Sequence, residues 1–129
     1  MFEVGVVSQF EAAHSLPSGF GPASRKHGHT YRVEVSVQGA RLQPGGVLMD
    51  ITILQEALRA ALDPLDYQDL DELDEFSHAS STAEGVAVYL FQFISPRLRG
   101  AEVDSLKVMV WESPGAFASF DGPLNQGPE

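Results

Sequence analysis

Three histidines have the residue type and spacing that most clearly indicate chemistry in this sequence. His27 and His29 flank a single glycine, directly before a segment of alternating polar and apolar residues. Because side chains two positions apart in a strand point to the same face, both imidazoles can reach one ion. His14 ends an earlier extended segment, and an antiparallel hairpin would bring it beside the pair. Three neutral imidazoles leave a fourth coordination position open, which is typical of catalytic zinc.

An alternative interpretation is that these histidines are ordinary polar side chains at the end of a strand. The spacing alone does not decide between the two. His78 has no partner at ligand spacing, and we expect it to be exposed to solvent. The chain has no cysteine, which excludes a disulfide framework, a thiolate zinc site, an iron–sulfur cluster and a thiol nucleophile.

Charge and length exclude several other classes of protein. The 129 residues include 8 Lys plus Arg and 18 Asp plus Glu, a net charge of −10. This balance argues against nucleic-acid and membrane-surface partners, which attract basic patches. No apolar run approaches the roughly 20 residues that span a bilayer, and we expect a cytoplasmic protein. The length suits one domain, predicted over residues 1–122 with a flexible tail at 123–129.

The histidines must be positioned by the elements around them. Residues 2–11 and 30–38 predict strands, and Tyr31, Val33, Val35 and Val37 share one face of the second. The intervening loop, 15–26, is long enough to suggest a functional role. Residues 51–62 predict an amphipathic helix with Asp50 as its N-cap.

The second half of the chain predicts one more helix and two more strands. An acidic segment, 65–80, reads as a solvated loop. Ser81 to Glu84 fits a capping box that begins a helix ending before Pro96. Residues 107–111 and 116–120 predict closing strands. The order ββααββ indicates an α+β fold, a four-stranded antiparallel sheet with two helices on one face. Its two open edges favour a ring-like homo-oligomer.

The chain resembles the 6-pyruvoyl-tetrahydropterin synthase and 6-carboxy-tetrahydropterin synthase family through an ordered set of short motifs. These run from about Phe2 to Asp121: FEAAH at 10–14, HGHTY at 27–31, Met49-Asp50, PLD at 64–66, STAE with VAVY at 81–89, and VWE at 110–112. The resemblance implies a T-fold subunit, trimers that close their sheets into a barrel, and a hexamer of two trimers with active sites between subunits.

The resemblance also implies roles for individual residues. His14, His27 and His29 match the family's zinc ligands, and Glu112 matches the glutamate that anchors the pterin. A carboxylate can accept two parallel hydrogen bonds from the 2-amino and ring N–H groups of a pterin. Thr82 and Glu84 match positions near the pterin pocket, although the capping box explains both equally well.

The sequence departs from the family at the groups that move protons. The family's cysteine position falls at Ala23, and its Asp-His pair appears as Asp66-Tyr67. A phenol, with a pKa near 10, exchanges protons poorly at neutral pH. Ser24 is a further candidate base, and Arg25 could hold a phosphate or carboxylate of a substrate.

Three hypotheses follow from this combination. The first is a zinc enzyme of lyase type that acts on a pterin-like substrate by a variant mechanism, with Asp66, Tyr67 or Ser24 moving protons. The second is an inactive pterin-binding homologue. The third is a small metal-binding domain in which the histidines serve storage or structure. We favour the first, with the usual synthase reaction in doubt because the catalytic Cys and His are absent.

Overall fold

A long hairpin forms the middle of the sheet and carries all three histidines. The computed structural model describes residues 1–77 and 80–124. Strand β1 (Phe2–His14) pairs antiparallel with β2 (His27–Gly39), and His14 lies opposite His27. Strands β4 (Ser105–Ser113) and β5 (Ala116–Pro123) extend the sheet beyond β2.

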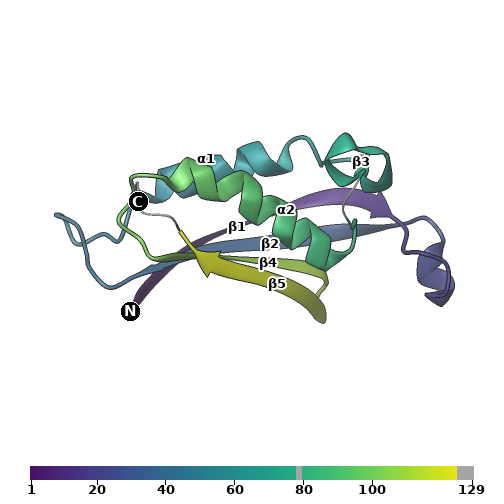
Figure 1. Ribbon diagram of the computed structural model, residues 1–129, viewed down its shortest axis with the longest axis horizontal. Coiled ribbons are helices and arrows are strands. Elements are labelled where there is room, and N and C mark those ends of the chain that lie inside the picture. The colour runs from purple at the N-terminus through teal and green to yellow at the C-terminus, as the bar shows by residue number, and fades with distance from the viewer. Residues whose placement is uncertain (78–79, 125–129) are drawn as a thin grey trace.

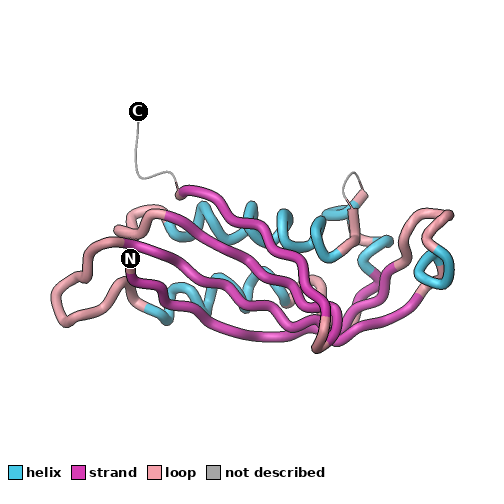
Figure 2. Tube along the Cα trace, turned by 90° about the horizontal axis from the view of Figure 1, so that it is seen from below, coloured by secondary structure: helices cyan, strands magenta, loops and turns pink. Residues whose placement is uncertain are grey.

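Both helices cover the same face of the sheet. Helix α1 (Ile51–Leu62) and helix α2 (Ala83–Ile94) lie above the strands in Figure 1, and Figure 2 shows the opposite face without a helix. Asp50 caps α1 as predicted, because its carboxylate accepts the Thr52 N–H at 2.9 Å. Short 3-10 turns cover Gly21–Ser24, Leu70–Glu72, Asp74–Phe76 and Ser95–Leu98. No helix of the described residues is long and apolar enough to cross a membrane.

The core lies between the sheet and the helices. The apolar face of β2 predicted from the alternation, formed by Tyr31, Val33, Val35 and Val37, is fully buried. The helices contribute the apolar stripe that includes Leu54, Leu58, Val86 and Leu90. The predicted α+β fold is therefore confirmed, with antiparallel pairing along most of the sheet.

The sheet has one strand that the sequence did not predict. Strand β3 (Gln68–Asp69) pairs parallel with Ala12 and Ala13 of β1, giving the order β3-β1-β2-β4-β5. Its two residues are too few to leave a periodic pattern. At the other end of the chain, β5 reaches Pro123 and Leu124 is buried. Residues 125–129 of the predicted tail lie outside the described residues, and the domain boundary stays a prediction.

The start of α2 corrects the predicted capping box. Thr82 is the N-cap, and its hydroxyl accepts the Gly85 N–H at 3.1 Å. Ser81 is buried, and its hydroxyl donates to Asp71 instead. Glu84 is thus the second residue of the helix and not the third, which a capping box requires. The cap therefore accounts for Thr82 but not for Glu84.

Candidate metal centre and pterin site

The three histidines converge on the helix-covered side of the hairpin, where the loop 15–26 begins and ends. Their ring centroids are 4.6 Å apart for His14 and His27, 5.1 Å for His14 and His29, and 4.9 Å for His27 and His29. One ligand atom from each ring lies within 4.8 Å of the others. The pairing of β1 with β2 produces this triangle, as the spacing predicted.

Two of the imidazoles are oriented by backbone carbonyls. His14 Nδ1 is 2.7 Å from the carbonyl oxygen of Ser81, and His27 Nδ1 is 2.7 Å from that of Arg25. Because a carbonyl can only accept, each Nδ1 must carry the proton. Of the two neutral tautomers, this hydrogen bond selects the one whose lone pair is on Nε2, which is the atom that can then bind a metal.

The unpartnered nitrogens fit a cation. Nε2 of His14 and Nε2 of His29 are buried and have no hydrogen-bond partner among the described residues. A buried polar atom without a hydrogen-bond partner lowers the stability of the fold unless a ligand binds to it. Burial lowers the pKa of His29 below its ordinary value, against the opposing charge of Glu112. His29 is therefore neutral at pH 7 and can offer a lone pair.

Glu112 faces the histidines from the end of β4. Its Oε2 lies 3.8 Å from His14 Nε2 and 4.0 Å from His29 Nε2, and its side chain is 32% exposed. The carboxylate thus has one side toward the candidate metal ligands and another toward solvent. A molecule that approaches the histidines would meet Glu112 at the same time.

Tyr31 is a part of the site that sequence reasoning missed. Its ring stacks on that of Phe10, with the ring centroids 4.7 Å apart, and forms T-shaped pairs with the rings of His14 and His29. Tyr31 therefore packs directly against two of the three histidines. Its hydroxyl is buried and has no partner among the described residues. Burial, together with the charges of Glu112 and Asp71, raises its pKa well above the ordinary value. The motif HGHTY contained this residue, but alternation identified it only as core.

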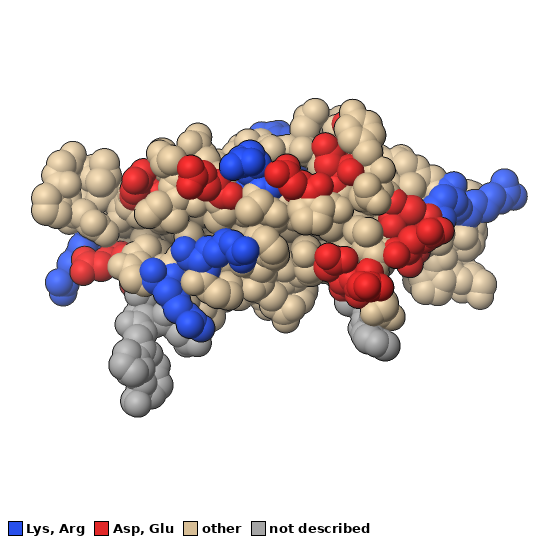
Figure 3. All heavy atoms as spheres, turned by 90° about the horizontal axis from the view of Figure 1, so that it is seen from above, with Lys and Arg blue, Asp and Glu red and all other residues tan. Residues whose placement is uncertain are grey.

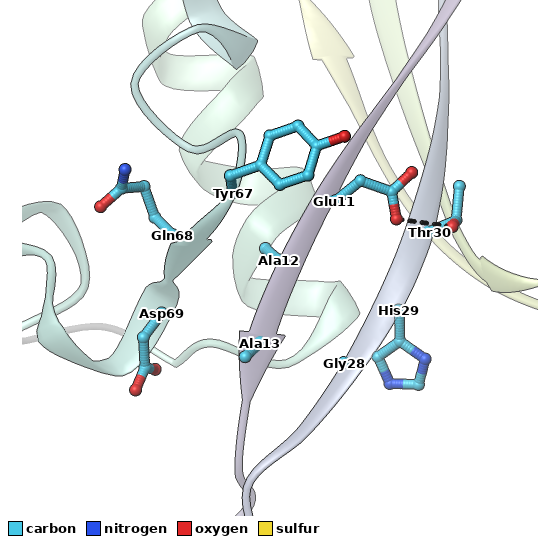
Figure 4. A pocket seen from close by; sticks show the side chains of 9 residues that line it. All are labelled: Glu11, Ala12, Ala13, Gly28, His29, Thr30, Tyr67, Gln68 and Asp69. Atoms are coloured by element: carbon cyan, nitrogen blue, oxygen red, sulfur yellow. Dashed lines mark hydrogen bonds between the residues drawn. The ribbon is translucent and has the colours of Figure 1, made fainter.

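The proton-transfer candidates do not meet the histidines of their own chain. Asp66 accepts the Glu11 N–H at 2.9 Å, and the Tyr67 N–H donates to the Glu11 carbonyl at 2.6 Å, so both residues hold the outer edge of β1. Tyr67 is 80% exposed and has a φ of 60°, a strained value for tyrosine. In Figure 4 its ring extends toward Glu11, whereas the His29 ring points away from it.

The remaining predicted site residues lie around the rim. The Ser24 hydroxyl donates to the carbonyl of Gly21 within its own turn. Arg25 is exposed in the loop, and only its carbonyl contacts a histidine. Thr82 is occupied as the cap of α2, and Glu84 is exposed on the first turn. His78 lies outside the described residues.

Comparison with known proteins agrees with this geometry. A family model described as 6-pyruvoyl tetrahydropterin synthase matches residues 3–123. The chain belongs to this family.

Two relatives named as synthases of this family are identical to this chain at about a third of the aligned positions. The chain is 36% identical over 101 residues to the 6-carboxy-5,6,7,8-tetrahydropterin synthase of Synechocystis, covering 73% of this chain and 78% of that one. It is 34% identical over 99 residues to the 6-pyruvoyl tetrahydrobiopterin synthase of Drosophila melanogaster, covering 75% of this chain but only 58% of that one. The chain thus spans less than two thirds of the fly protein.

A solved member of the synthase family has the same fold. The structure of Caenorhabditis elegans 6-pyruvoyl tetrahydropterin synthase superposes with a TM-score of 0.82 at 27% identity, covering 94% of this chain and 95% of that chain. Family membership and the T-fold are therefore shown. This chain has no cysteine at any of its 129 positions.

Proposed function

We propose that this protein binds a pterin-like compound beside a zinc ion held by His14, His27 and His29, and that it is a lyase-type enzyme with a variant proton-transfer mechanism. The single observation that carries the proposal is the pair of buried, unpartnered Nε2 atoms facing the Glu112 carboxylate. Relatives named as 6-pyruvoyl and 6-carboxy tetrahydropterin synthases supply the substrate class.

In this proposal, different side chains bind the ion and the pterin. The three Nε2 atoms would hold the ion, which would supply Lewis-acid polarisation of a substrate oxygen and stabilise negative charge there. Glu112 accepts hydrogen bonds from the 2-amino and ring N–H groups of the pterin and so orients the ring. Arg25, at the exposed rim, could pair with a phosphate or carboxylate carried by the substrate.

Proton transfer is where this chain differs from the family pattern. Ala23 cannot take the part of a cysteine, and Tyr67 stands where that pattern has histidine. The Asp66 carboxylate is held against the outer edge of β1 and the Tyr67 ring is exposed beside it, so these residues would act on a site completed by a neighbouring copy. The hexamer of two trimers that the resemblance implies would supply such a copy. Ser24 is the remaining candidate base within the loop.

A binding protein without turnover is the second candidate. The missing cysteine and the tyrosine at position 67 favour it, because both are losses at groups that move protons. A purely structural or storage metal site is less well supported, since it would have no use for a partly exposed carboxylate, that of Glu112, beside the histidines.

Two measurements test the site itself. Metal analysis should find one zinc per chain in the wild type and none in His27→Ala, and a metal-free wild type would refute the zinc site. Calorimetric titration with sepiapterin, neopterin and biopterin should detect binding that Glu112→Gln weakens. Glu56→Gln, which removes an exposed carboxylate of α1, is the control for Glu112. Glu84→Gln tests the role implied for Glu84.

Turnover separates the enzyme from the binding protein. The wild type is incubated with dihydroneopterin triphosphate, and products are followed by chromatography. An enzyme should consume the substrate, whereas binding without any product favours the second candidate. The double variant Ala23→Cys/Tyr67→His restores the family's two groups. If their loss is what suppresses the standard reaction, the double variant should gain it.

A further inference from the structure

Most carboxylates of the acidic segment are exposed, as its composition predicted, but the segment is also anchored to the rest of the protein. Leu70 and Phe76 are buried, and between them Asp71 accepts four hydrogen bonds. Its Oδ2 lies 2.8 Å from the Ser15 N–H nitrogen, 2.9 Å from the Ser15 hydroxyl and 2.6 Å from Lys26 Nζ. Its Oδ1 accepts the Ser81 hydroxyl at 2.6 Å. One carboxylate therefore joins both ends of the loop 15–26 to the residue that precedes the N-cap of α2.

Three of these four hydrogen bonds bear on His14. Ser15 directly follows His14, so its two hydrogen bonds to Asp71 fix the backbone where β1 ends. Ser81 carries the carbonyl that accepts the hydrogen bond from His14 Nδ1–H, with 2.7 Å between the two heavy atoms. Because the Ser81 hydroxyl is bound to Asp71, this carbonyl is held in a defined place. Asp71 thus positions both the ring's own backbone and the acceptor that selects its tautomer.

The remaining contact bears on His27. Lys26 directly precedes His27, and its ammonium group bridges Asp71 at 2.6 Å and Asp69 at 2.9 Å. The carbonyl that accepts from His27 Nδ1 belongs to Arg25, on the other side of Lys26. Holding Lys26 therefore holds the loop backbone that orients the second imidazole.

The charges agree with a fixed contact. Burial opposes ionisation of Asp71, but hydrogen bonds from Lys26, Ser81 and Ser15 outweigh it and hold the pKa of Asp71 below its usual range. Hydrogen bonds to Asp71 and Asp69 raise the pKa of Lys26. Figure 3 shows acidic side chains gathered at this end of the molecule, next to the Lys and Arg side chains at its tip. Hydrogen bonds to a charged acceptor are about twice as strong as neutral ones.

We propose that Asp71 is the positioning residue of the metal centre, which holds the Ser81 and Arg25 carbonyls where they set the tautomers of His14 and His27. This inference rests on the proposed function, since it gives those tautomers their purpose. It adds a residue that touches neither the ion nor the substrate. Residues that orient metal ligands in this way commonly contribute a factor of 10–100 in metal affinity.

The test reads the imidazoles directly, without relying on activity. Protein labelled with ¹⁵N at histidine is stripped with a chelator, and long-range ¹H–¹⁵N spectra at pH 7.5 report the tautomers of His14 and His27. In the wild type both rings should carry the proton on Nδ1. In Asp71→Asn both should shift toward a mixture, and zinc affinity, measured by chelator competition, should fall about 10- to 100-fold.

Matched variants separate positioning from a general loss of structure. Asp74→Asn removes a carboxylate of the same segment whose side chain has no hydrogen bond to the described residues, and it should change neither tautomers nor affinity. Ser81→Ala should disturb His14 more than His27, and Lys26→Met should do the opposite. These two single-contact variants decide the matter if Asp71→Asn fails to fold.

The outcomes distinguish this proposal from the proposed function. A folded Asp71→Asn protein with wild-type tautomers and wild-type zinc affinity would overturn the positioning role. A wild type that binds no zinc but shows the tautomer shift in Asp71→Asn would support the positioning role and remove the zinc enzyme.

Discussion

Replacing Tyr31 by phenylalanine should stabilise the metal-free protein. The Tyr31 hydroxyl is buried and has no partner among the described residues, and a buried polar group without a hydrogen bond costs roughly 1–3 kcal/mol. The substitution removes only that hydroxyl and keeps the ring that stacks on Phe10. Because the raised pKa keeps the phenol neutral at pH 7, no charge is lost. We expect the free energy of unfolding to rise by about 1 kcal/mol.

Urea unfolding of chelator-treated protein at fixed concentration measures this change, since bound metal or altered assembly would shift the apparent stability. In a domain of this size a gain of 1 kcal/mol corresponds to about 4 °C in Tm. Tyr89→Phe is the control, because Tyr89 is only partly buried on α2 and its hydroxyl is not among the unpartnered buried atoms of the described residues. Its variant should stay within about 0.5 kcal/mol of the wild type.

The same variant should bind a pterin less well if the hydroxyl serves the site. Stability and ligand affinity would then move in opposite directions, as they do where a site keeps a polar group unsatisfied for its ligand. A Tyr31→Phe protein that is less stable than the wild type would refute this reasoning, because the hydroxyl would then have a stabilising partner.

Three further predictions follow from the backbone and the acidic segment. Gly85→Ala should destabilise the protein by about 2 kcal/mol or more, because a Cβ at this position would overlap the Ser80 carbonyl. Thermal unfolding measures the change. Gly115→Ala is the control and should not destabilise the protein, because a Cβ there would lie in open space. Folding lowers the pKa of Asp71, so its contribution to stability is fully present above about pH 4 and is lost progressively as the pH falls below that value. In urea titrations, the stability gap between wild type and Asp71→Asn should therefore stay constant from pH 7 to pH 5 and begin to narrow between about pH 4 and pH 3. Tyr67→Gly should leave the free energy of unfolding unchanged or raise it by about 0.5–1 kcal/mol, because glycine adopts the φ of 60° at this position without strain. A clearly lower free energy of unfolding in urea would contradict this prediction.

Local sequence patterns predicted the helices and most strands, whereas the residues at which these elements end depend on contacts with other parts of the chain. The alternation of Tyr31 to Val37 and the apolar stripe of 51–62 are properties of neighbouring residues, and both were found as predicted. The residue pattern typical of a strand covers only 2–11, yet β1 continues to His14. It does so because each added residue pairs with β2, as His14 does with His27. Pairing across a hairpin leaves no mark in the local sequence.

The candidate site divides in the same way. The histidine triangle could be predicted because one hairpin brings all three rings together. Glu112 could be placed only by resemblance, since nothing in its neighbours distinguishes it from an exposed acid at a strand end. The Ser81 carbonyl could not be predicted at all, because a backbone oxygen has no residue-type signal and its partner His14 lies 67 positions away.

That separation has a consequence for the order of folding. A chain that has formed only the β1–β2 hairpin already brings its three histidines close together, but the carbonyl that orients His14 arrives only when the segment before α2 docks. The contacts of Asp71 with Ser15 and Lys26 likewise span 56 and 45 positions. Contacts this distant in sequence close late and slowly. The final orientation of the candidate metal ligands should therefore form in the last stage of folding, and binding of a metal there should report a completely folded chain.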